Sequence, residues 1–119
     1  METQSFVKSV FDSVDAKDAN KFISFLTDDA TFKFANMEAV VGKDNVKQAV
    51  AGFFGSINGM SHKIHESFDH NGTIVNRGEV TYTRLDKSEL TVPFANFFKM
   101  NGEKIKEYLI YVDASELYA

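Results

Sequence analysis

Two carboxylates and one arginine are the residues of this chain whose types and placement best fit chemistry. Arg77-Gly78-Glu79 lies inside an apolar, β-prone segment, and Asp113 closes another such segment. An unpaired charge buried in such a segment is costly, so these groups either face solvent or form a polar site. A guanidinium between two carboxylates lets the pair share a proton, which is the arrangement of an acid–base site. The alternative is that Arg77 and Glu79 form a surface ion pair of little energetic weight.

The histidines and the remaining polar motifs give weaker signals. His62 and His65 are three residues apart in a predicted strand, so they face opposite sides and make a poor metal pair. His70 falls in a predicted turn. No Ser-His-Asp order and no phosphate-binding loop stand out. We therefore expect no metal and no cofactor.

The composition is that of a single soluble globular domain, which we expect to span residues 1–119. Hydrophobic residues make up 44% of the chain and charged residues 25%. The unusual feature is twelve phenylalanines with no tryptophan and no cysteine. So many phenylalanines can build a large core or line a roomy apolar pocket, and the pocket would suit a small hydrophobic molecule.

Charge and segment composition bear on partners and location. A net charge of −4 with scattered lysines argues against nucleic-acid binding. The first eight residues lack the pattern of a signal peptide, and no apolar run approaches the roughly 20 residues of a membrane span. The absence of cysteine is compatible with a reducing compartment. We expect a cytoplasmic protein with no membrane or nucleic-acid partner.

Hydrophobic periodicity places helices first and long strands afterwards. Helical spacing predicts an amphipathic helix over residues 6–14 and a second one, capped by Asp18, that carries apolar residues up to position 26. Two short strands, 30–34 and 37–41, precede a third helix that starts at Gly42 and is expected to end at Gly59.

Beyond that helix the period changes to two, which predicts long strands over residues 61–69, 73–85, 89–100 and 103–113. The turns between them include Asn-Gly pairs, a strong hairpin signal. Helices followed by a meander of strands indicate an α+β fold with three N-terminal helices packed on one face of a strongly curved sheet. The predicted strands 73–85 and 103–113, which carry the charged residues, each mix polar and apolar residues on both faces. The pattern therefore does not settle which face meets the helices.

The segment order resembles the nuclear transport factor two-like cone fold, in its SnoaL-like branch. The resemblance covers nearly the whole chain. It implies a cone-shaped α+β barrel, with a mixed or antiparallel sheet that encloses a deep apolar pocket. It also implies a homodimer, because related cone folds commonly pair through their sheets.

Three stretches more closely resemble the limonene-1,2-epoxide hydrolase group: Ala35-Asn36-Met37, Arg77-Gly78-Glu79-Val80, and the last strand from Lys104-Ile105 to Tyr111-Val112-Asp113. By this resemblance Arg77 is the triad arginine, Asp113 the base and Asn36 a ligand of the attacking water. Glu79 stands where that group has an acid aspartate, and Phe34 stands where it has a water-binding tyrosine.

The resemblance implies three functions that the residues leave open. One is the opening of a hydrophobic epoxide by water that a carboxylate activates, with Arg77 between Glu79 and Asp113. A second is isomerase- or cyclase-type proton transfer, with Asp113 or Glu79 as the base. A third is a non-catalytic module that binds a hydrophobic ligand. Fold alone does not decide among them.

Overall fold

The computed structural model describes residues 2–118, and it has the predicted α+β order. The elements are α1 (Thr3–Asp15), α2 (Ala19–Ile23), β1 (Leu26–Phe34), β2 (Val40–Val41), α3 (Lys43–Gly55), β3 (Gly59–His70), β4 (Thr73–Thr83), β5 (Glu89–Asn101) and β6 (Lys104–Val112). Among these described residues, no helix combines the length and apolar character needed to cross a membrane.

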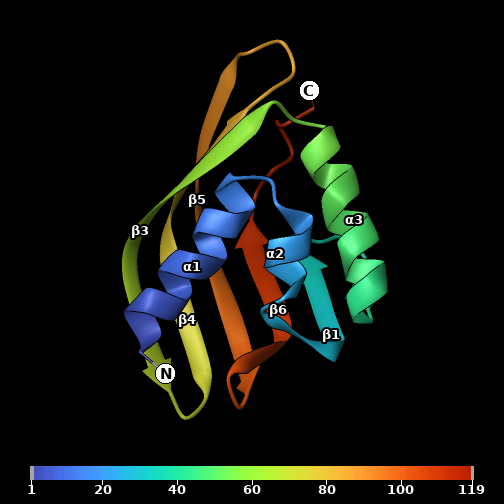
Figure 1. The fold of residues 1–119 in the computed structure, drawn as a ribbon. Helices are drawn as coiled ribbons and strands as arrows, with labels where there is room; N and C mark the ends of the chain where they lie inside the picture. The colour runs from blue at the N-terminus through green and yellow to red at the C-terminus, as the bar shows by residue number, and fades with distance from the viewer. Residues whose placement is uncertain (1, 119) are drawn as a thin grey trace.

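The strands of residues 2–118 form one mixed sheet in the order β2-β1-β6-β5-β4-β3. Strands β3 to β6 make an antiparallel meander, whereas β1 pairs in parallel with β6. Figure 1 shows the helices on one face of the sheet, with α1 crossing beside β3 and α3 beside β1. The sheet curls around them but does not close, so the predicted cone is an open one.

Side-chain caps explain where the first two helices begin. The carboxylate of Glu2 accepts hydrogen bonds from the backbone N–H groups of Gln4 and Ser5. Asp18 caps α2, as the sequence predicts, by accepting from the N–H of Lys21 at 3.0 Å. The predicted end of the third helix is wrong: α3 ends at Gly55, and Gly59 begins β3 instead.

Strand β3 contains a β-bulge where it pairs with β4. The pairing register shifts between Ile64 and Glu66, which leaves His65 as the extra residue. Gly78 lies opposite this bulge, and a Cβ atom there would stand 2.0 Å from the carbonyl oxygen of Lys63. The bulge therefore requires glycine at position 78.

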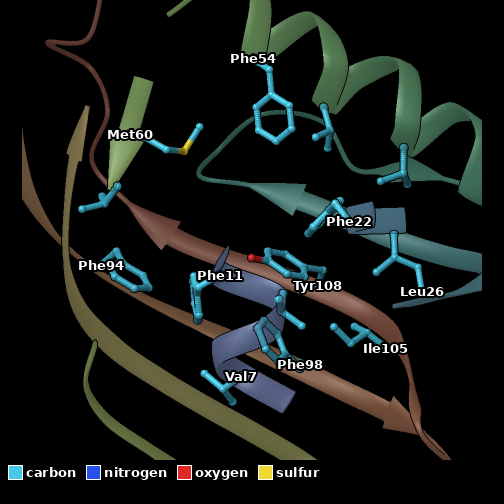
Figure 2. Close-up of a cluster of buried hydrophobic side chains, with 14 of the residues drawn as sticks. Val7, Phe11, Phe22, Leu26, Phe54, Met60, Phe94, Phe98, Ile105 and Tyr108 are labelled. Atoms are coloured by element: carbon cyan, nitrogen blue, oxygen red, sulfur yellow. The ribbon is translucent and has the colours of Figure 1, made fainter. Parts of the chain in front are cut away.

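The core lies between the helices and the inner face of the sheet (Figure 2). Phe22 and Phe98 are almost fully buried, and Phe11 packs against Phe94 and Phe98. Burial of each such ring contributes roughly 2–3 kcal/mol. Other phenylalanines border the large cavity described next, so the phenylalanines serve both roles that the composition allows.

Candidate functional site

A cavity of about 790 Å³ lies inside the cone, is open at one end and is lined mainly by apolar side chains. This volume suits a small organic ligand. Its wall includes Phe22, Phe32, Phe34, Phe53, Val80 and Phe94, and its polar lining includes Asn36, His62, Asn96, Tyr108 and Asp113. The exposed residues Asn36, Met37 and Glu38 mark its mouth, whereas the buried Asn96 and Tyr108 mark its closed end.

Arg77 and Glu79 do not line this cavity. They lie on the outer face of β4, because their neighbours Asn76, Gly78 and Val80 take the inner, buried face. The Arg77 guanidinium pairs with Glu66, and its side chain is 60% exposed. The prediction that Arg77, Glu79 and Asp113 converge in one pocket is wrong, and the surface ion-pair interpretation describes Arg77.

Glu79 also has its partner on the outer face. Its carboxylate lies 3.6 Å from Nε2 of His65, the bulged residue of β3. An exposed pair of this kind contributes little to stability. Neither member of the predicted Arg77–Glu79 pair can reach a ligand inside the cone.

The other three predicted site residues do line the cavity, near its open end. Phe34 belongs to the wall and packs against Phe53, with ring centroids 5.4 Å apart. Asn36 is exposed in the turn after β1. Asp113 is exposed just beyond β6, where its carboxylate accepts the N–H of Ser115 at 3.0 Å. Hydrogen bonds from Ser115 lower the pKa of Asp113, which makes it a weak base.

The cavity instead holds a histidine that is oriented by an aspartate. Asp15, at the end of α1, accepts the backbone N–H of His62 at 3.1 Å and contacts ring atom Nδ1 at 2.6 Å. An ionised carboxylate is only an acceptor, so in the neutral imidazole Nδ1 carries the proton and Nε2 has the free lone pair. Within residues 2–118, the ring of His62 makes its side-chain hydrogen bond through Nδ1 and none through Nε2.

The imidazole of His62 is held between aromatic rings at the cavity wall. Its centroid lies 4.8 Å from that of Phe11 and 5.2 Å from that of Phe94. The side chain is only 11% exposed. A smaller space of about 220 Å³ between α1 and β3 is bordered by Asp15 and His62 as well. The two residues therefore separate the apolar cavity from a polar crevice.

The sequence pattern bears on His62 only as a poor metal ligand beside His65, and it assigns no role to Asp15, which directly follows the predicted helix of residues 6–14. The signal present in the sequence was the alternation of Met60, His62 and Ile64, which puts a histidine on an apolar strand face. Its partner lies 47 residues away, and no local pattern links them. Within the described residues no group of three His, Cys, Asp or Glu side chains could hold a metal ion.

A chain of buried polar side chains runs from β3 to the closed end of the cavity. Ser67 Oγ donates to Asn76 Oδ1 at 2.6 Å, and Asn76 Nδ2 donates to Asn96 Oδ1 at 2.8 Å. Asn96 Nδ2 lies 3.5 Å from the hydroxyl oxygen of Tyr108. Asn76 and Asn96 have 0% and 2% of their surface exposed. Such amides need partners, and this chain provides them.

Two tyrosines at the cavity stay protonated far into alkaline pH. Burial, with a smaller contribution from the Asp15 carboxylate, raises the pKa of Tyr108 well above its ordinary value. Burial raises the pKa of Tyr82 to about 12. Both side chains are therefore neutral hydrogen-bond donors at physiological pH.

An open cone of helices and curled sheet around an apolar cavity defines the nuclear transport factor two-like class of fold. A family model for the SnoaL-like domain matches residues 7–108, and the chain belongs to that family. The fold that the segment order predicts is thus confirmed. No curated protein sequence matches the chain.

Solved structures with the same fold share little sequence with this chain. A protein of Catenulispora acidiphila with a ketosteroid isomerase-like fold, in complex with trimethylamine, has a TM-score of 0.84 at 15% identity, covering 92% of this chain and 86% of its own. A candidate SnoaL-like polyketide cyclase of Shewanella denitrificans has a TM-score of 0.82 at 11% identity (96% and 92% covered). An LEH-like epoxide hydrolase of M. tuberculosis has a TM-score of 0.82 at 14% identity (99% and 90% covered). At these identities the likeness concerns the fold.

Proposed function

We propose that this chain is an acid–base enzyme that removes a carbon-bound proton from a small apolar molecule, with His62 as the base and Asp15 as its positioning residue. The observation that supports this proposal is the Asp15–His62 hydrogen bond, which leaves Nε2 as the free basic atom of a ring that lines the cavity. This is the isomerase- or cyclase-type function that the sequence left open, with a different base from those expected there.

The chemistry follows from the roles of the two ring nitrogens. Nε2 takes the proton from carbon, and the electron pair of the broken C–H bond moves into an adjacent electron-withdrawing group. The imidazolium that forms is stabilised by the Asp15 carboxylate on its other side. Return of the proton to a different carbon gives an isomer. Attack of the carbanion on a carbonyl carbon of the same molecule closes a ring: the π bond of that carbonyl breaks, its electrons move to oxygen, and the alkoxide takes the proton from the imidazolium.

Water reaches the outer side of the pair through the polar crevice between α1 and β3, because Asp15 has 28% of its side chain exposed. Only the proton on Nδ1 can exchange there. The proton taken from carbon is on Nε2, on the cavity side, and it exchanges with water that enters at the open end of the cavity. Exchange through that opening is an expected property of this site.

Epoxide opening through a bridged carboxylate pair is not proposed, because Arg77 and Glu79 lie outside the cavity. Asp113 alone, exposed and with a lowered pKa, lacks both an acid partner and basic strength. Non-catalytic ligand binding remains the outcome against which the enzyme proposal is tested.

The test is deuterium incorporation from D2O into a panel of apolar molecules with activated C–H bonds: cyclic ketones, enones and nitroalkanes. We expect mass spectrometry to show exchange that depends on the protein for at least one class and that His62→Gln abolishes. Binding without exchange across the panel would contradict the enzyme proposal and favour a binding module.

We also propose that two copies of the chain pair through the outer face of the sheet. Phe68, Val75, Phe97 and Leu109 form one cross-strand row there, and Phe68 is 51% exposed. Glu66 and Arg77 lie side by side next to the row and are already paired with each other, so a copy rotated by half a turn offers the same apolar row without an unpaired charge from these two residues. Light scattering should give twice the 13.4 kDa chain mass, and Phe68→Glu should give the monomer. A monomeric wild type would contradict this pairing.

A further inference from the structure

We propose that Tyr108 and Asn96 form a binding site for a ligand oxygen at the closed end of the cavity, and that the ligand class is therefore apolar ketones and their enols. This inference deepens the proposed function, because a carbonyl is the group that acidifies a neighbouring C–H bond. The site itself is argued from the hydrogen-bond chain that ends at Tyr108, and it can be tested by binding alone.

The direction of that chain fixes which atoms of Asn96 face Tyr108. Asn96 Oδ1 is occupied by the donor Nδ2 of Asn76 at 2.8 Å. Asn96 therefore presents its Nδ2 atom, a donor, to the Tyr108 oxygen. Asn76 is held in turn by the Ser67 hydroxyl at 2.6 Å. Ser67 and Asn76 thus position Asn96 without lining the cavity themselves.

The Tyr108 hydroxyl consequently has a hydrogen with no acceptor. Its neighbour Asn96 Nδ2 is a donor, and the hydroxyl makes no other hydrogen bond within the described residues. The side chain is 3% exposed and lines the cavity. A buried donor without an acceptor is costly, which favours a ligand that brings an acceptor.

The Tyr108 hydroxyl points toward the part of the cavity wall that holds His62, the proposed base. Figure 2 shows the Tyr108 oxygen directed toward Phe11 and Phe94, away from Leu26 and Ile105. Phe11 and Phe94 are also the two rings that contact His62. A ligand lying along these rings can therefore meet Tyr108 and His62 at different atoms.

The contact between Asn96 and Tyr108 leaves room for the ligand oxygen. At 3.5 Å it is long for a hydrogen bond, so neither group is fully engaged by the other. A carbonyl oxygen has two lone pairs and can accept from both the phenol and the amide. The same two donors would stabilise the negative charge that develops on that oxygen when the neighbouring C–H bond breaks.

The experiment compares a ketone with its hydrocarbon counterpart, 1-tetralone with tetralin, by isothermal titration calorimetry. Tyr108→Phe removes the hydroxyl and keeps the ring. We expect it to weaken binding of tetralone roughly five- to tenfold, the effect of one neutral hydrogen bond, and to leave tetralin binding unchanged. Tyr111→Phe is the matched control, because Tyr111 lies on the same strand with its side chain 59% exposed.

Three results would overturn the oxygen site. The first is that tetralone fails to bind the wild type, the second is that Tyr108→Phe binds tetralone as tightly as the wild type does, and the third is that Tyr108→Phe weakens the binding of tetralone and tetralin equally. The test is independent of turnover. A ketone-selective loss in Tyr108→Phe, found together with no deuterium exchange in the wild type, would support the oxygen site and contradict the proposed function. Deuterium exchange in the wild type, found without a ketone-selective loss in Tyr108→Phe, would support the proposed function and contradict the oxygen site.

Discussion

Asp15 holds His62 by two atoms at once: one carboxylate oxygen accepts the backbone N–H at 3.1 Å, and the other contacts ring Nδ1 at 2.6 Å. The first contact fixes the strand against the end of α1. The second fixes the tautomer and the direction of Nε2. The helix that carries Asp15 therefore sets the orientation of a basic nitrogen in a cavity wall made by the sheet.

Replacement of Asp15 by asparagine should impair catalysis far more than it impairs stability. The amide keeps the shape of the carboxylate but does not require Nδ1 to carry the proton, and it cannot stabilise the imidazolium. We expect the rate of deuterium exchange to fall by about 10²–10⁴-fold. The matched control is Asp12→Asn, which removes an exposed carboxylate of the same helix that pairs with Lys8 at 2.7 Å. A similar rate in Asp15→Asn and Asp12→Asn would contradict the assigned role.

Substitution of the outer-face charges should have no effect on turnover. Arg77→Gln and Glu79→Gln remove groups that pair with Glu66 and His65 in solvent, on the face opposite to the cavity. We expect the free energy of unfolding of the monomer to change by less than about 1 kcal/mol and the exchange rate to stay within twofold. A tenfold loss of exchange in either variant would show that this face takes part in the chemistry.

Gly78→Ala should be strongly destabilising, because its Cβ atom would collide with the carbonyl oxygen of Lys63 at the bulge. We expect urea unfolding to show a loss on the order of 3 kcal/mol. Gly52→Ala is the control: in helix α3 its Cβ atom would meet no heavy atom of residues 2–118 within 4 Å apart from its chain neighbours and the backbone of its own helix. That substitution should stabilise the protein by up to about 1 kcal/mol. Equal changes in the free energy of unfolding for Gly78→Ala and Gly52→Ala would mean that the bulge relaxes freely.

The buried tyrosines predict a loss of stability at alkaline pH. In the unfolded chain a tyrosine ionises near pH 10, whereas burial raises the pKa of Tyr82 to about 12 in the folded protein. The unfolded state therefore releases more protons above pH 10, and the stability falls as pH rises from about 10 to 12. We expect Tyr82 to account for about 1 kcal/mol of the difference between pH 9 and pH 11, measured by urea unfolding. Tyr82→Phe should reduce that difference, and an unchanged difference would contradict the raised pKa.

The order of elements was predictable from the sequence, and the orientation of the central strands was not. Period-two patterns and Asn-Gly turns locate β3 to β6 to within a few residues. In β4, however, the buried face carries Asn76 and Gly78, and the outer face carries Val75 alongside Arg77. Because both faces mix polar and apolar residues, hydrophobicity alone could not decide which one meets the helices.

The site was harder to predict because its parts are distant in sequence. The resemblance pointed to Phe34, Asn36 and Asp113, and these residues line the cavity near its open end. The resemblance also pointed to Arg77, whose position depends on which face of β4 meets the helices. The Asp15–His62 contact joins a helix end to a strand 47 residues later, and only tertiary packing brings them together.

The rate of deuterium exchange into a bound ketone, compared between the wild type and His62→Gln, decides whether His62 is the base. We expect the substitution to lower the rate at least 100-fold while tetralone still binds, since Tyr108 and Asn96 hold the oxygen independently of the base. Exchange that continues at the wild-type rate in His62→Gln would contradict it and remove His62 as the base.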